Sequence, residues 1–97
     1  MIYVKIHKGT ENDVVAVCDK ELIGKKFSEG KLCLDIKKDF YEGELMDKDK
    51  VKDILKKAGN LNIVGKESIE IALKEKIINQ NSIIRIKGVP HAQVYSL

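Results

Sequence analysis

The residues best suited to chemistry are a cysteine–aspartate pair and a distant histidine. Cys18 and Asp19 are adjacent, and His91 lies near the other end of the chain, in a bend at residues 88–91. A histidine can deprotonate a thiol while a carboxylate orients the imidazole, so these three residues are candidates for nucleophilic catalysis. Free cysteine is also among the most buried residue types. We therefore retain two alternatives, a small enzyme or ligand-binding protein using Cys18 and His91, and a structural Cys18.

Potential metal ligands are scattered along the chain. They are His7, Cys18, Asp19, Cys33 and His91. No two of them have the spacing of a Cys-x-x-Cys or His-x-x-x-His pair, so the sequence predicts no metal site and no cofactor. The acidic residues in segment 39–49 lack the arrangement of a calcium loop, and we interpret that segment as a solvated loop.

The segment Gly65-Lys66-Glu67-Ser68 invites comparison with a phosphate-binding loop. A Walker A loop needs a second glycine five residues upstream and a Ser or Thr directly after the lysine. Asn60 occupies the first position and Glu67 the second. We interpret Gly65 as the start of a helix, whose N-terminal N–H groups and Lys66 retain some capacity for an anion.

Basic residues slightly outnumber acidic ones. The chain has 18 Lys and Arg against 15 Asp and Glu, a formal charge of +3, and Arg85 is its only arginine. Lysines flanking aromatic residues on strands can bind single-stranded RNA, although a solvated lysine face is the common alternative. The candidate RNA-binding residues are Lys25, Lys26, Gly65, Lys66, Arg85 and Lys87.

Hydrophobic patterning predicts the elements that would position these residues. Residues 14–18 are five consecutive apolar residues and predict a buried central strand, paired as an antiparallel hairpin with a strand at 2–8. Alternation predicts further strands at 32–36 and 83–87 and an edge strand at 92–97, while Pro90 indicates a break or an edge. A helix is predicted at 48–58 with Asp47 as N-cap, and another begins at Gly65.

These elements together predict one α+β domain spanning residues 1–97. It has an antiparallel or mixed sheet of four to five strands, with two main helices packed on one face. Residues 61–64 are expected to be an extended, buried connector between the helices. No apolar run is long enough to cross a membrane, and the alternating N-terminus differs from a signal peptide. We therefore expect a cytoplasmic protein with reduced cysteines. A Cys18–Cys33 disulfide is the alternative.

Four short segments carry a family resemblance. They are VAVCD at 15–19, LIGK at 22–25, NIVG at 62–65 and GVPHAQ at 88–93. In their order and spacing the whole chain resembles a family of small archaeal proteins of unknown function. The resemblance implies no agreed activity, cofactor or substrate, and it implies an association with translation and ribosome export.

These observations predict a small non-catalytic binding protein that acts on RNA or on ribosome-associated factors in translation, as a monomer or weak homodimer. Besides the enzyme with Cys18 and His91, the other alternative is a protein-interaction module. Its binding edge would be the C-terminal segment 94–97, because an unpaired strand edge can accept a partner strand.

Overall fold

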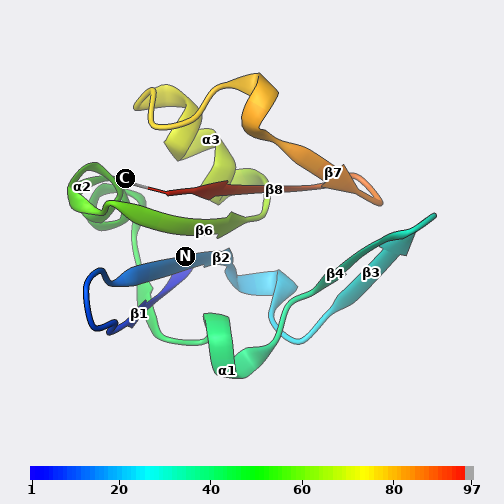
Figure 1. The fold of residues 1–97 in the computed structure, drawn as a ribbon, viewed down its shortest axis with the longest axis horizontal. Coiled ribbons are helices and arrows are strands. Elements are labelled where there is room, and N and C mark those ends of the chain that lie inside the picture. The colour runs from blue at the N-terminus through cyan, green and yellow to red at the C-terminus, as the bar shows by residue number, and fades with distance from the viewer. Residues whose placement is uncertain (96–97) are drawn as a thin grey trace.

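A computed structural model describes residues 1–95 of the chain (Figure 1). A six-stranded mixed sheet has the strand order β5-β1-β2-β6-β8-β7, and a separate hairpin pairs β3 with β4. The elements are β1 (Ile2–His7), β2 (Val14–Asp19), η1 (Lys20–Leu22), β3 (Lys26–Glu29), β4 (Leu32–Asp35), α1 (Lys38–Tyr41), β5 (Glu44–Met46), α2 (Lys48–Lys57), β6 (Asn60–Val64), α3 (Lys66–Lys74), η2 (Gln80–Ser82), β7 (Ile84–Ile86) and β8 (Val89–Val94). The predicted α+β class with a mixed sheet is confirmed.

Strand β2 lies at the centre of the sheet, as its apolar composition predicts. It pairs antiparallel with β1 and parallel with β6. Val15 and Val17 point into one core, and Ala16 and Cys18 point into another on the opposite face of the sheet. Because both faces are covered, residues 15–18 of this strand are apolar on both sides.

The two main helices cover one face of the sheet. Val51 and Leu55 of α2 and Ile69 and Ala72 of α3 are buried in the core that contains Val17. Helix α2 begins as predicted, because Asp47 Oδ1 accepts a hydrogen bond of 2.9 Å from the Lys50 backbone N–H. In the described part of the chain, no helix combines the length and the apolar character that crossing a membrane requires.

The opposite face is covered by the hairpin and by the short helix α1. Leu34, Ile36 and Tyr41 are buried there against Ala16 and Cys18. Figure 1 shows the β3–β4 hairpin reaching beyond the main sheet toward β7. A hydrogen bond of 2.6 Å from the Lys87 N–H to Glu29 Oε1 joins the hairpin to the β7–β8 turn.

The six-stranded sheet contains two strands, β5 and β6, that hydrophobic patterning does not predict. Residues 61–64, expected as a connector, belong to β6, which is hydrogen-bonded on one side to β2 and on the other to β8. Residues 44–46, expected within an acidic loop, form the edge strand β5 against β1. The predicted third strand belongs instead to the separate β3–β4 hairpin. Strands this short owe their conformation to their neighbours rather than to their own propensity.

The predicted C-terminal edge is also corrected. Strand β8 is paired with β6 on one side and with β7 on the other, so β7 is the edge strand and Pro90 lies inside β8. The two-residue turn at Lys87 and Gly88 makes Ile86–Val89 a hydrogen-bonded pair, so the next pair, Arg85–Pro90, needs no N–H from residue 90. Residues 96–97 of the predicted edge segment lie outside the described residues.

Candidate functional site

A groove of about 470 Å³ lies at the carboxyl ends of the two parallel strands. Strand β2 ends there with Asp19, and β6 continues there through Gly65 into α3. We call it the helix groove; it is lined by residues that include Asp19, Glu21, Lys66, Glu67, Lys87 and Pro90. In open α/β sheets, ligands bind at this end of parallel strands.

Asp19 holds the start of α3 in this groove. Its Oδ2 accepts a hydrogen bond of 3.0 Å from the Glu67 N–H, and its Oδ1 accepts bonds of 2.8 Å from the Ser68 N–H and 2.6 Å from Ser68 Oγ. Asp19 directly precedes η1, but its side chain makes no capping bond there. The carboxylate instead caps a helix that begins 47 residues later in the chain, at Lys66, an arrangement that no local pattern predicts.

Gly65 gives Asp19 the room to reach the helix. Its φ of 110° lies in a region that side chains rarely adopt, and a Cβ at this position would overlap the Asp19 carboxyl group. The Gly65 N–H donates to the Pro90 carbonyl at 2.9 Å. The helix N–H groups considered above for an external anion are therefore used by Asp19, and Gly65 serves internal packing rather than a ligand.

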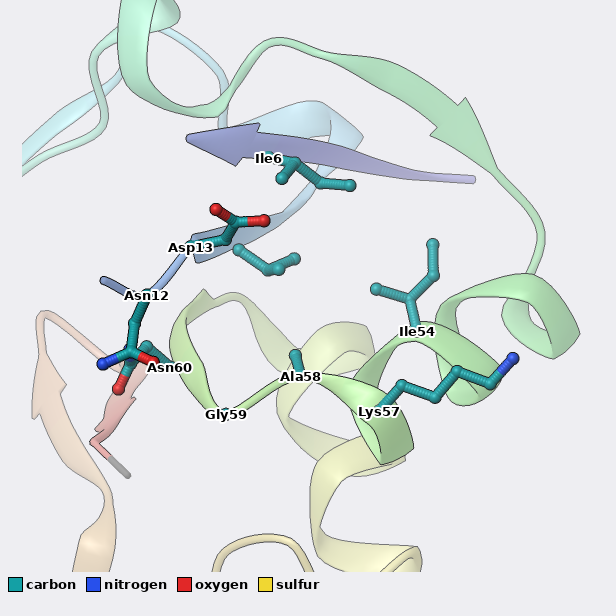
Figure 2. A pocket seen from close by; sticks show the side chains of 9 residues that line it. Ile6, Asn12, Asp13, Ile54, Lys57, Ala58, Gly59 and Asn60 are labelled. Carbon is teal, nitrogen blue, oxygen red and sulfur yellow. The ribbon is translucent and has the colours of Figure 1, made fainter. Parts of the chain in front are cut away.

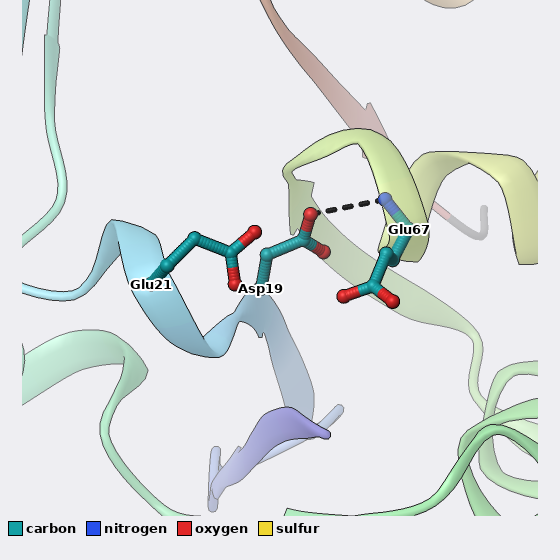
Figure 3. A group of neighbouring side chains, drawn as sticks. All are labelled: Asp19, Glu21 and Glu67. Carbon is teal, nitrogen blue, oxygen red and sulfur yellow. Dashed lines mark hydrogen bonds between the residues drawn. The ribbon is translucent and has the colours of Figure 1, made fainter.

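Two further carboxylates approach Asp19, which sequence patterning did not single out. Oxygen atoms of Asp19, Glu21 and Glu67 all lie within 4.8 Å of one another (Figure 3). Within residues 1–95 this is the only group of three or more His, Cys, Asp or Glu side chains close enough to share an ion, so the scattered candidates His7, Cys33 and His91 do not form one. Glu21 and Glu67 would repel a phosphate from the floor of the groove.

Three of the candidate basic residues lie in this groove or next to it. Lys66 and Lys87 line it, and Lys66 and Arg85 line an adjoining hollow of about 300 Å³ that shares Gly88 and Pro90 with the groove. Lys25 and Lys26 lie at the start of the hairpin and are exposed. The ion pairs of the described chain involve other lysines, at positions 8, 52, 56 and 74.

The structure does not bring Cys18, Asp19 and His91 together as a catalytic set. Cys18 and His91 lie on β2 and β8, with Val64 of β6 between them as the partner of both. The Cys18 thiol donates to the backbone carbonyl of Asp19, and His91 Nδ1 bonds to the Ile63 carbonyl at 3.0 Å. Burial, reinforced by the negative charges of Asp19 and Glu21, raises the pKa of Cys18 to about 12, which opposes thiolate formation at neutral pH.

We therefore predict that an alkylating reagent distinguishes the two cysteines. Cys18 is completely buried, whereas Cys33 is exposed on the hairpin, and both are free thiols. At neutral pH, iodoacetamide should modify Cys33 in the native protein and should modify Cys18 only after unfolding, as read by mass spectrometry of tryptic peptides. Modification of native Cys18 as fast as Cys33 would contradict the buried, structural role.

A second hollow, of about 390 Å³, lies at the opposite end of the parallel strands (Figure 2). Ile6, Val15 and Ile54 form its apolar wall, beside Asn12 and Asp13. The Asp13 carboxylate is already neutralised by Lys8 at 3.0 Å. None of the candidate binding residues lies in this hollow, and the exposed Lys57 is the further charged residue in its lining.

Both phenylalanines of the chain are used inside the fold. Phe27 and Phe40 pack against the core that contains Cys18. Phe40 also stacks on His7, with ring centroids 4.4 Å apart, and its carbonyl bonds to His7 Nε2 at 2.8 Å. His7 is therefore half-buried rather than solvent-facing, and any stacking surface must be formed by other residues.

Comparison with known proteins gives a family and a fold without an activity. Residues 7–97 match a family model described as "Protein of unknown function (DUF424)". A crystal structure of an uncharacterized conserved protein from Methanopyrus kandleri, an archaeon, superposes with a TM-score of 0.81 at 25% identity, covering 99% of this chain and 91% of that one. No curated protein matches the sequence.

Proposed function

We propose, from the premise that the chain belongs to the family of unknown function DUF424, that it is a non-catalytic RNA-binding protein of the cytoplasm. The observation that carries the proposal is the group of basic side chains at one end of the molecule. Lys66, Arg85 and Lys87 are exposed around the β7–β8 turn and form no ion pair with any residue in the described part of the chain. Unpaired basic side chains are free to replace the counterions of phosphates.

The hairpin is joined to this basic surface through Glu29. Its Oε1 accepts the hydrogen bond from the Lys87 N–H, which holds the last residue of β3 beside the turn, and the exposed Lys26 lies at the other end of that strand. Other lysines are instead ion-paired: Lys74 pairs with Glu70 on α3, and the lysines at positions 52 and 56 pair with Glu75 at the C-cap of that helix. Because Glu21 and Glu67 repel phosphates from the groove floor, the RNA backbone would follow the rim between Lys66 and Lys87.

We predict that the triple variant Lys66→Ala, Arg85→Ala and Lys87→Ala binds a short single-stranded RNA much more weakly. Three lost phosphate contacts should reduce the slope of log affinity against log salt by about 2. Fluorescence anisotropy of a labelled oligouridine over a range of salt concentrations measures both quantities.

The matched control is the triple variant Lys52→Ala, Lys56→Ala and Lys74→Ala, which removes the same charge from residues that are already ion-paired. It should retain the wild-type salt slope. If both triple variants lose affinity equally, net charge rather than the basic rim governs binding. If wild-type protein shows no salt-sensitive binding to RNA, the proposed function is wrong.

A further inference from the structure

A groove of about 440 Å³ separates the hairpin from the outer strands of the main sheet. We call it the hairpin groove; its lining includes Leu32 and Cys33 of the hairpin, Ile84 of β7, and His91, Gln93 and Tyr95 of the C-terminal segment. Three of its side chains, Leu32, Ile84 and Tyr95, are large hydrophobic groups that are 49%, 53% and 69% exposed. Such a concentration of exposed apolar surface is typical of binding sites.

Hydrogen bonds order one wall of the hairpin groove. The Tyr95 hydroxyl donates to Gln93 Oε1 at 2.6 Å, and the Gln93 amide lies 3.5 Å from His91 Nε2. His91 Nδ1 carries the proton, because its partner, the Ile63 carbonyl, can only accept. Burial lowers the pKa of His91, so the ring is neutral at neutral pH and its Nε2 can accept from Gln93. These hydrogen bonds restrict the motion of the exposed Tyr95 ring, so the ring loses less conformational entropy when a ligand binds.

The charges around the hairpin groove suit a nucleotide. Among the described residues that line it, none is an aspartate or a glutamate. Lys87 is the turn residue directly after the groove-lining Ile86, whereas the Arg85 side chain lines the hollow on the opposite face of β7. Because β7 is an edge strand, a strand of RNA that contacts these cations can cross that edge and place a base on the apolar side of β7.

We infer that the hairpin groove takes an unpaired nucleobase of single-stranded RNA, stacked on Tyr95. The Gln93 amide, which has a second N–H and a second lone pair, lies beside the ring to meet the base edge. This inference rests on the proposed function, since Arg85 and Lys87 would hold the adjoining phosphates. The base contacts would then lie in the hairpin groove, and the phosphate contacts at the cations around the β7–β8 turn.

The test compares Tyr95→Ala and Tyr95→Phe with wild-type protein, on oligouridine and on a strand of equal length that lacks bases. Stacking of one base on an aromatic ring predicts that Tyr95→Ala weakens oligouridine binding about tenfold. Its salt slope should be unchanged, because no ionic contact is lost. Tyr95→Phe should retain most of the affinity, and the abasic strand should bind wild-type protein and Tyr95→Ala equally. Circular dichroism confirms that the variants are folded.

Equal affinity of wild-type protein for oligouridine and the abasic strand would overturn this inference while leaving the salt-sensitive function intact. Absence of salt-sensitive binding to either strand would overturn the proposed function as well. Perturbation of the Tyr95 and His91 NMR signals by an apolar peptide, but not by oligouridine, would assign the groove to a protein partner and overturn the base-binding inference.

Discussion

Replacing Asp19 by alanine should lower the free energy of unfolding by about 3 to 5 kcal/mol, because it leaves two helix N–H groups and one hydroxyl without their buried acceptor. Asp19 is only 2% exposed, so water cannot replace the carboxylate without a rearrangement of α3. In a chain of this size such a loss lowers the melting temperature by roughly 15 to 20 °C or more. Urea denaturation followed by circular dichroism measures the change.

The matched control for this change is Asp47→Ala. Asp47 also caps a helix, but it is exposed and makes one capping bond, to the Lys50 N–H. Its loss should cost about 1 kcal/mol. If Asp19→Ala does not fold, Asp19→Asn is measured in its place. It keeps one acceptor oxygen, so its loss of unfolding free energy should be intermediate. If Asp19→Ala proves no more destabilising than Asp47→Ala, the carboxylate does not hold the start of α3.

Replacing Gly65 by alanine should cost a similar amount, about 3 to 5 kcal/mol, for two separate reasons. The backbone of Gly65, at φ 110° and ψ 153°, is in a region almost restricted to glycine, and the added methyl group would overlap the Asp19 carboxyl. Gly30→Ala is the matched control, because Gly30 also has a positive φ but has no neighbouring atom within 4 Å of an added Cβ. It should cost only about 1 to 2 kcal/mol.

A double-mutant cycle separates the two causes. In the Asp19→Ala background the overlap disappears while the backbone strain remains, so Gly65→Ala should cost at least about 1 kcal/mol less there than in wild-type protein. Independent, additive effects of the two substitutions would show that Gly65 is needed only for its backbone conformation. A cost of Gly65→Ala equal to that of Gly30→Ala would remove the steric argument altogether.

Both substitutions also bear on the proposed function. Lys66 is the first residue of α3, and the Asp19 cap fixes the turn on which it is placed. Pro90, whose carbonyl accepts the Gly65 N–H, connects the same turn to the β7–β8 hairpin that carries Arg85 and Lys87. The buried Asp19–Gly65 contact thus positions the cations at the rim without touching a ligand.

Short-range patterns were sufficient where one local feature dominates. The central strand was predictable because five consecutive apolar residues need cover on both faces, and α2 because its N-cap and apolar stripe are local. Strand β6 is not predictable in this way, because a run this short has no hydrophobic period of its own and is defined only by its hydrogen bonds to β2 and β8. Pro90 was expected at an edge, yet it is accommodated inside β8 by the register of the β7–β8 turn.

The sequence by itself determined the α+β class, the buried central strand, the first long helix and the set of basic residues, because composition and periodicity carry that information locally. Only the tertiary structure decided which of these residues meet. It directed the Asp19 carboxylate to α3 rather than to the adjacent η1, separated Cys18 from His91 by a strand, and gathered Lys66, Arg85 and Lys87 around one turn. The physical reason is that strand order and register join residues far apart in the chain, and no short-range pattern encodes them.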